Sequence, residues 1–248
     1  MQLPEIKHSV SIDELYEQSP VGANLSKVDN PAARWLGLSL AVTWYEFEKK
    51  LNATPIIRSI NERTITLVEY RDLLINMCYH DGPRWMLRAA SNMDERHEVI
   101  RNALIAHVSR EHQDFHLLER DYVAVGGDLK HITQYPRNIG YEALSAYVFQ
   151  QTSAPNPLPA FGVTFIIEGV GRKLTGRWAQ NLKQALELTD QQMSNLIYHS
   201  CNDAGHYDGF IKMIASPYIT PSVALQIARV AQVASRLYVL QFEEMGNF

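Results

Sequence analysis

Cysteine is scarce in this sequence, since Cys78 and Cys201 are the only two among 248 residues. Two cysteines are too few for a disulfide framework, and neither belongs to a C-x-x-C pair. A disulfide-stapled scaffold and a dithiol redox site are therefore excluded. We expect both residues to be buried, unreactive thiols.

An excess of positive charge is also missing. The 23 Lys and Arg residues are outnumbered by 27 Asp and Glu, which gives a formal net charge of −4 and a pI near 6.1. This balance offers no basic surface for nucleic acid and favours small-molecule chemistry. The first residues lack the apolar core of a signal peptide, and no run approaches the roughly 18 apolar residues of a membrane span. We therefore expect a cytoplasmic protein with no nucleic-acid or membrane partner.

The sequence also lacks a Pro-, Gly- or Ser-rich linker, an internal repeat and strand-period alternation. These absences predict one all-α domain over residues 1–248, a bundle of seven or eight helices. An irregular lead-in is expected at 1–30, with one short helix near 11–18. Apolar residues at helical spacing predict longer helices over 32–51, 64 or 66 to 79, 94–125, 140–151, 160–182, 190–215 and 221–240, with another short one near 83.

Several of these helices carry start signals. Asn30 before Pro31 is expected to cap the helix that follows, and Thr64 or Thr66 the next one. Thr220-Pro221 is expected to open the last helix.

The segment 190–215 carries the spacing His199-x3-Asp203-x2-His206. At about 100° per residue, these three positions fall within a helical sector roughly 60° wide, so the two imidazoles and the carboxylate project together. Three such donors on one face suit a metal ion. A solvated polar stripe is the alternative reading of the same pattern.

Further acids interrupt apolar stripes elsewhere. Glu111 lies within the stripe of the helix 94–125, Asp114 follows one turn later, and Glu168 lies on the apolar face of the helix 160–182. His107 shares the face of Glu111 and is a possible ligand or a donor to one. His112 and His116 lie on a different face and are expected at the surface.

Charge balance favours a metal at these acids. Burying one ionised carboxylate without a partner costs several kcal/mol, so four that face one another require cations. Two divalent metals would neutralise Glu111, Asp114, Glu168 and Asp203, with neutral imidazoles completing the shells. Oxygen and nitrogen ligands without thiolates suit iron or manganese rather than structural zinc. The alternative is an internal ion pair, for which Arg172 stands four residues after Glu168.

Three stretches resemble the haem-oxygenase-like di-iron oxidase family: residues 107–126, residues 161–169 and the His199-x3-Asp203-x2-His206 motif. The resemblance implies a haem-oxygenase-like bundle with two Fe(II) ions, O2 as co-substrate and a small amino-acid-like substrate. It implies that both catalysis and metal binding involve Glu111, Glu168, His199, Asp203 and His206. The family's Glu-x2-His is Glu111-x2-Asp114 here, so the sixth metal ligand is Asp114, His107 or His112.

The Glu-x2-Asp variation and the length are similar to nitrile-forming members of that family. This similarity implies oxidative conversion of a tryptophan derivative to an indole-3-carbonitrile, a step of natural-product biosynthesis. Oxidative decarboxylation, C–C cleavage and N-oxygenation of an amino or fatty acid are alternatives within the family. Two alternatives lie outside this family. One is a metal-free thiaminase-like hydrolase, which would need a cysteine nucleophile, and the other is a non-catalytic helical binding protein. A homodimer is compatible with the aromatic content.

Overall fold

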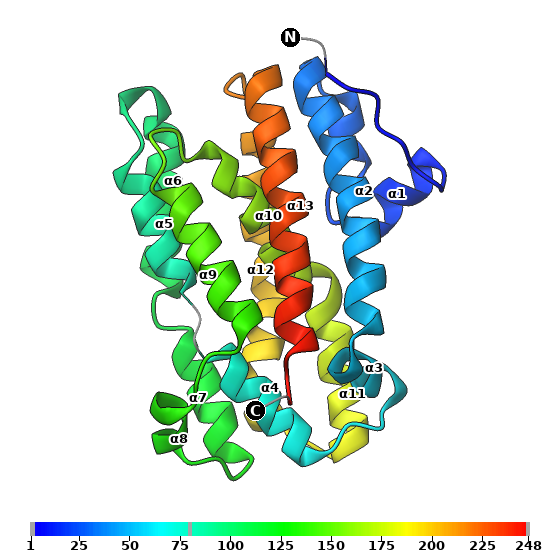
Figure 1. The fold of residues 1–248 in the computed structure, drawn as a ribbon, viewed down its shortest axis with the longest axis vertical. Coiled ribbons are helices and arrows are strands. Elements are labelled where there is room, and N and C mark those ends of the chain that lie inside the picture. Colours follow the sequence, from blue (N-terminus) through cyan, green and yellow to red (C-terminus); the bar gives the residue numbers. More distant parts are fainter. Residues whose placement is uncertain (1–2, 79–80, 247–248) are drawn as a thin grey trace.

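The protein is described by a computed structural model that covers residues 3–78 and 81–246, without the side chains of 23–24 and 202–208. Over this range the chain is helical and contains no strand, which confirms the predicted all-α class (Figure 1). The three longest helices are α2 (Pro31–Ala53), α12 (Ser194–Ile214) and α13 (Pro221–Glu243).

Shorter helices complete the bundle: α1 (Ile12–Gln18), α3 (Pro55–Glu62), α4 (Leu67–Met77), α5 (Gly82–Ser91), α6 (Glu98–Glu111), α7 (Phe115–Ala124), α8 (Leu129–Gln134), α9 (Ile139–Thr152), α10 (Phe161–Val170) and α11 (Gly176–Leu186). Four 3-10 turns lie between them: η1 (Ala23–Lys27), η2 (Glu95–His97), η3 (Leu158–Ala160) and η5 (Asp190–Gln192). A π-helical turn, η4 (Gly171–Thr175), joins α10 to α11. The bundle contains more helices than the seven or eight predicted, because short helices such as α3 and α8 form where the sequence predicted connections.

The predicted helix starts are confirmed. The side chain of Asn30 accepts hydrogen bonds from the backbone N–H groups of Ala32 and Ala33. Thr66 forms a capping box with Glu69, and Thr220 accepts from the N–H of Val223. Each cap satisfies backbone donors that the first helical turn leaves without a partner inside the helix.

The continuous helix predicted over 94–125 is wrong. α6 ends at Glu111, and α7 begins at Phe115. Between them the N–H of Asp114 donates to the carbonyl of Glu111 at 3.0 Å, and the N–H of Leu117 donates to the carbonyl of Asp114 at 2.9 Å. These bonds span three residues rather than four, so the chain tightens and turns where the stripe predicted no interruption.

Helix α13 lies at the centre of the bundle and packs against α2, α9 and α10 (Figure 1). Glycines allow two of these contacts. A Cβ atom on Gly162 of α10 would lie 2.5 Å from the backbone N of Ala231, and one on Gly140 of α9 would clash with the backbone N of Gln241. The backbones therefore approach too closely for any side chain at these positions.

By length and composition alone, α13 could cross a membrane. The sequence predicted no such helix, because it contains no run of roughly 18 apolar residues. Its most apolar window has a mean hydropathy of 1.2 and is 44% buried. Buried residues such as Ala224, Ile227 and Ala231 contribute to the core. These are the contacts of a core helix, and a core helix passes the same test of composition.

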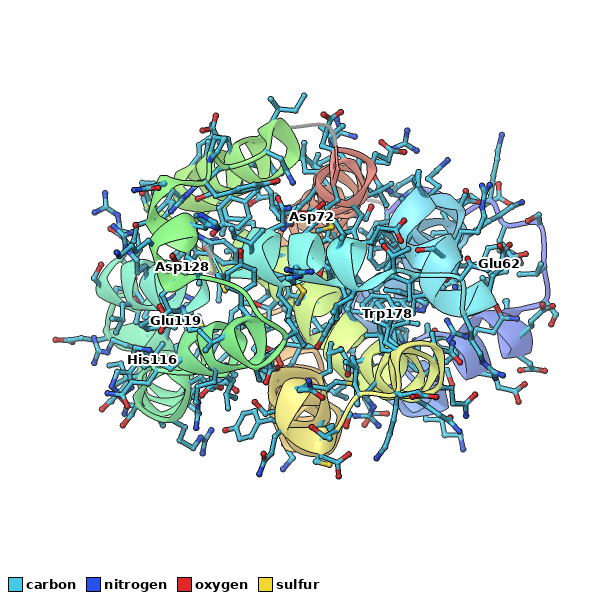
Figure 2. The ribbon with its side chains drawn as sticks, turned by 90° about the horizontal axis from the view of Figure 1, so that it is seen from below. Glu62, Asp72, His116, Glu119, Asp128 and Trp178 are labelled. Carbon is cyan, nitrogen blue, oxygen red and sulfur yellow. The ribbon has the colours of Figure 1, made fainter. Side chains whose placement is uncertain are left out.

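Figure 2 shows the bundle from below. Trp178 of α11 lies between helices, and its exposed fraction is only 2%. His116 and Glu119 lie on the outer side of α7, where their side chains pair at 2.6 Å. The side of α7 that carries these two residues is therefore solvent-facing.

We expect Gly162→Ala to lower the free energy of unfolding by roughly 1–3 kcal/mol, because the added methyl group meets backbone atoms that cannot rotate away. Gly209→Ala is the matched control, since a Cβ there meets nothing within 4 Å. In a helix this control should be neutral or stabilising by up to about 1 kcal/mol. Urea denaturation of both variants measures the difference, and equal stabilities would contradict the close approach.

Candidate metal centre

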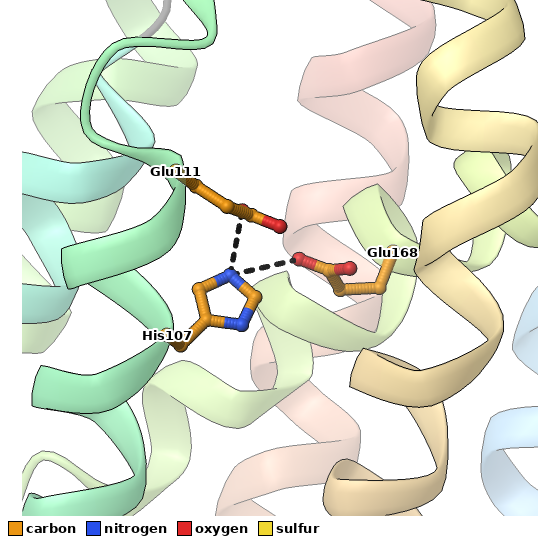
Figure 3. Close-up of side chains that lie close together, drawn as sticks. All are labelled: His107, Glu111 and Glu168. Carbon is orange, nitrogen blue, oxygen red and sulfur yellow. Dashed lines mark ion pairs between the residues drawn. The ribbon is translucent and has the colours of Figure 1, made fainter.

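Three side chains from two helices converge inside the bundle (Figure 3). His107 and Glu111 lie one turn apart on α6, and His107 Nε2 is 2.7 Å from Glu111 Oε2. Glu168 reaches them from α10, with its Oε1 3.8 Å from the same nitrogen. One donor atom from each residue lies within 4.8 Å of the other two. In the part of the chain that the structure describes, this is the one such group of three His, Cys, Asp or Glu residues.

All three side chains are largely withdrawn from solvent. Their exposed fractions are 13% for His107, 10% for Glu111 and 9% for Glu168. When both carboxylates are ionised, the one imidazole can supply at most one of the two positive charges that would balance them in this poorly solvated place. Such a group favours a bound cation.

Of the six residues proposed as metal ligands, Glu111 and Glu168 belong to this group of three. Glu111, Asp114, Glu168 and His199 all line one cavity. Asp114 occupies the N-cap position of α7 but forms no side-chain cap bond there. Asp203 and His206 belong to α12, and their side chains lie outside the described residues.

Of the three residues that the sequence left open as the sixth ligand, Asp114, His107 and His112, only His107 belongs to this group of three. His112 is exposed, and His116 is exposed and paired with Glu119, so neither belongs to the cluster. The i,i+4 spacing of His107 and Glu111 was the available signal. The sequence did not single out this spacing, because a continuous helix would also have placed Asp114 close to Glu111.

The cavity beside the cluster has a volume of about 150 Å³. It lies between helices from both halves of the sequence, and most of its wall is apolar. Representative lining residues are Met86, Trp85, Phe115, Leu144, Phe161 and Phe242. Phe115 lines the cavity, whereas Phe165 is buried in the core against Trp44.

A π-helical turn, η4, begins three residues after Glu168. Within it, the hydroxyl of Thr175 donates to the carbonyl of Gly171 at 2.6 Å, and both residues line the cavity. π-Turns inside helices are rare and occur often at functional sites. Beside Glu168, the backbone of Gly169 lies against Trp44, since a Cβ there would be 2.6 Å from the indole ring.

The buried carboxylate of Asp121 connects α7 to the start of α12. It accepts hydrogen bonds from the N–H and hydroxyl of Ser194, at 2.9 and 2.6 Å, and from the N–H of Asn195 at 2.9 Å. Burial raises the pKa of Asp121, and these bonds oppose the rise. Because α12 carries His199, Asp121 fixes the helix that brings that histidine to the cavity.

The two cysteines differ in their environments. Cys78 is buried as expected, and burial raises its pKa to about 12, with the carboxylates of Glu119 and Asp121 adding to the rise. A thiol with that pKa is a poor nucleophile at neutral pH. The expectation of a buried Cys201 is wrong, because Cys201 is exposed on α12. Neither residue is among the described residues that line the cavity.

No protein-family model matches the sequence, and no curated protein does. Solved structures do match. A domain of unknown function with a heme oxygenase-like fold from Shewanella denitrificans is 17% identical over 83% of this chain and 89% of its own, with a TM-score of 0.73. A TenA homolog from Pseudomonas syringae pv. tomato is 13% identical over 90% of this chain and 99% of its own, also at 0.73.

A TenA homologue from P. horikoshii is similar as well, at 13% identity, with a TM-score of 0.68 over 86% of this chain and 98% of its own. Together these structures establish that the chain has the haem-oxygenase-like fold that the sequence predicted. At such low identity they show the fold alone. The chemistry of the site has to be argued from its own residues.

We expect Asp121→Asn to destabilise the fold by about 1–3 kcal/mol, because an amide NH2 would face a backbone N–H that now donates to a carboxylate. Asp128→Asn is the matched control: Asp128 caps α8 at the surface, and asparagine caps a helix equally well. Urea denaturation compares the two variants. A loss for Asp121→Asn no greater than that of the control would contradict the role of Asp121.

Proposed function

We propose that this protein is a non-haem di-iron oxidoreductase that uses O2 to oxidise a small amino-acid-type substrate. The observation that supports this proposal is the convergence of His107, Glu111 and Glu168 within 4.8 Å, beside a mostly apolar cavity that Glu111 and Glu168 line. A concave apolar site with a few converging polar groups is the usual form of an enzyme active site.

The donor set fits a divalent iron ion. Two carboxylates and one imidazole supply hard and intermediate ligands, and no thiolate among the described residues competes for a softer metal. The ion would also resolve the charge balance, since it replaces a repulsion between Glu111 and Glu168 with attraction of both. His107, Glu111 and Glu168 would hold the first ion.

A second ion would lie on the α12 side of the cavity. Asp114 and His199 line the cavity there, and Asp203 and His206 follow His199 on the same helix at positions that share its face. Asp114, His199, Asp203 and His206 would hold the second ion. When both are bound, the ions supply the electrons and open coordination positions that O2 activation needs.

The protein's own residues prepare the site for this chemistry. Apolar side chains such as Leu104, Leu118 and Ile167 line the cavity and limit access of water to it. The carboxylates and imidazoles stay in place because rigid helices carry them. Asp121 holds the start of α12 against α7, which orients His199.

For the particular reaction we propose the conversion of a tryptophan derivative to an indole-3-carbonitrile. Aromatic residues in the cavity wall, Trp85, Phe115 and Phe161, support an aromatic substrate. Oxidative decarboxylation, C–C cleavage or N-oxygenation of an amino or fatty acid at the same centre are the alternatives.

We also propose that the protein is cytoplasmic and has a single domain and no nucleic-acid partner, which its acidic composition supports. We propose a homodimeric state.

A metal-free thiaminase-like hydrolase is the less favoured reading of the same fold. It would need a cysteine nucleophile facing the cavity, whereas Cys78 has a raised pKa and Cys201 is exposed away from the described lining. A non-catalytic binding protein leaves the buried acids unexplained.

The proposal is tested by adding ferrous iron to metal-free protein under anaerobic conditions and measuring bound iron by elemental analysis. We expect two irons per chain, and a transient visible absorption band when O2 is added. His107→Ala should weaken iron binding by about tenfold or more, since it removes a ligand.

His112→Ala is the matched control, because it removes an exposed imidazole from the end of the same helix. It should bind iron like the wild type. Equal iron binding by His107→Ala and wild type, or no iron binding by the wild type, would contradict the proposal.

A further inference from the structure

Three uncharged polar side chains face the cavity without a hydrogen bond. Tyr238 and Gln241 of α13 and Asn195 of α12 all line it. Gln241 is 6% exposed and Asn195 is 4% exposed. The contacts that these two residues make with other elements use their backbone, the carbonyl of Gln241 and the N–H of Asn195. The phenol and the two amides form no hydrogen bond with the residues that the structure describes.

Other polar groups in the same wall do have partners. The hydroxyls of Thr152 and Thr175 donate to backbone carbonyls one turn earlier, at 2.9 and 2.6 Å. The hydroxyl of Tyr141 donates to the carboxylate of Asp81 at 3.2 Å. Buried hydroxyls and amides are almost always paired in folded proteins, because an unpaired group loses its hydrogen bonds to water and gains none. The phenol and the two amides are therefore groups for which the content of the cavity has to supply the partner.

Tyr238 and Gln241 lie three residues apart on α13, so they are neighbours on one face of the helix. The ring of Tyr238 stacks on that of Phe242, with 5.2 Å between the ring centroids. The carbonyl of Gln241 accepts from Nδ2 of Asn138 at 3.1 Å, and the same nitrogen donates to the side-chain oxygen of Asn76 at 3.0 Å. Gln241 is thereby connected to the C-terminal part of α4.

The start of α12 is connected to the same helix. The hydroxyl of Tyr70 of α4 donates at 2.7 Å to the carbonyl of Gln192, three residues before Asn195. Tyr70 and Asn76 are six residues apart, which corresponds to about 9 Å along a helix. α4 crosses the lower end of the bundle (Figure 2). The amides of Asn195 and Gln241 therefore lie at the same end of the cavity, within reach of one small ligand.

The groups at this end of the cavity are uncharged. Burial raises the pKa of the Tyr238 hydroxyl, so Tyr238 is a neutral phenol at physiological pH. None of the described lining residues is Lys or Arg, and the acids that line the cavity, Glu111, Asp114 and Glu168, are the proposed metal ligands. A charged ligand group would lose its hydration here and meet no opposite charge. An uncharged group loses less, and hydrogen bonds to the phenol and the amides replace what it loses.

We infer that Tyr238, Gln241 and Asn195 form a hydrogen-bonding subsite that selects ligands by an uncharged group able both to donate and to accept, such as a carboxamide or a lactam. Each of the three side chains offers a donor and an acceptor, so a ligand group with only one of these functions leaves part of the subsite unpaired. The subsite uses none of the proposed metal ligands. It rests on the proposed function, because it would hold the part of the substrate that does not react.

The test uses metal-free protein and three one-ring ligands of nearly equal shape: benzamide, acetophenone and benzoate. A single ring suits a cavity of about 150 Å³. Benzamide carries a donor and an acceptor, acetophenone only an acceptor, and benzoate a negative charge. Ligand-observed NMR titration gives each affinity. We expect benzamide to bind about tenfold more tightly than either of the others, because a site built to hydrogen-bond a group rejects analogues that lack it.

Tyr238→Phe should weaken benzamide binding by about tenfold, and Gln241→Met by a similar factor. Because the hydroxyl of Tyr238 bonds to no described residue, its removal should leave the urea midpoint of unfolding unchanged or raised, which a purely structural role would not give. Tyr147→Phe is the matched control, since Tyr147 is a partly buried tyrosine of α9 outside the described lining. It should leave the affinity for benzamide unchanged.

The inference is overturned if acetophenone or benzoate matches benzamide, if benzamide does not bind, or if Tyr238→Phe and Tyr147→Phe give equal affinities. Iron plays no part in these measurements, so they are separate from the test of the di-iron centre. Iron binding without ligand selectivity would reject the subsite alone. Ligand selectivity without iron binding would reject the metal centre alone.

Discussion

Two carboxylates that face one another inside an apolar bundle are the constraint on which the rest of this structure depends. Glu111 and Glu168 are both buried, and a single imidazole, that of His107, lies between them. Two ionised carboxylates held close together away from water repel one another, and burial disfavours their charged forms. A divalent cation between them would attract both carboxylates, so a bound metal would replace this repulsion with a favourable interaction.

The surrounding helices hold this arrangement in place. α13 runs through the middle of the bundle, and glycines on α9 and α10 let both helices approach its backbone. α10 thereby carries Glu168 on a rigid support. On the other side, Asp121 binds the first turn of α12 to α7, and Asp114 occupies the N-cap position of α7. The elements that carry the proposed ligands are thus connected to one another through buried, directional contacts.

Local chemistry made much of this predictable. Helix starts at Asn30, Thr66 and Thr220 follow from side chains that satisfy backbone donors, and an acid such as Glu168 on an apolar stripe signals a buried charge. The break between α6 and α7 was not predictable, because the apolar stripe continues across it and only tertiary packing selects the tighter turn.

The break between α6 and α7 also explains why the sequence did not single out His107 as the partner of Glu111. On a continuous helix Asp114 competes with His107 for the place beside Glu111, whereas in the folded chain His107 lies 2.7 Å from it. The exposure of Cys201 and the ring of Trp44 against Gly169 depend on distant segments in the same way. Helix periodicity states which face a residue occupies, but not what covers that face.

The most direct measurement is anomalous scattering at the iron edge from crystals grown anaerobically with ferrous iron. The account predicts a peak at bonding distance, about 2.1 Å, from His107 Nε2 and from an oxygen of each of Glu111 and Glu168. A structure in which iron is absent from this position while the three side chains keep their places would contradict the claim that a cation balances the buried carboxylates.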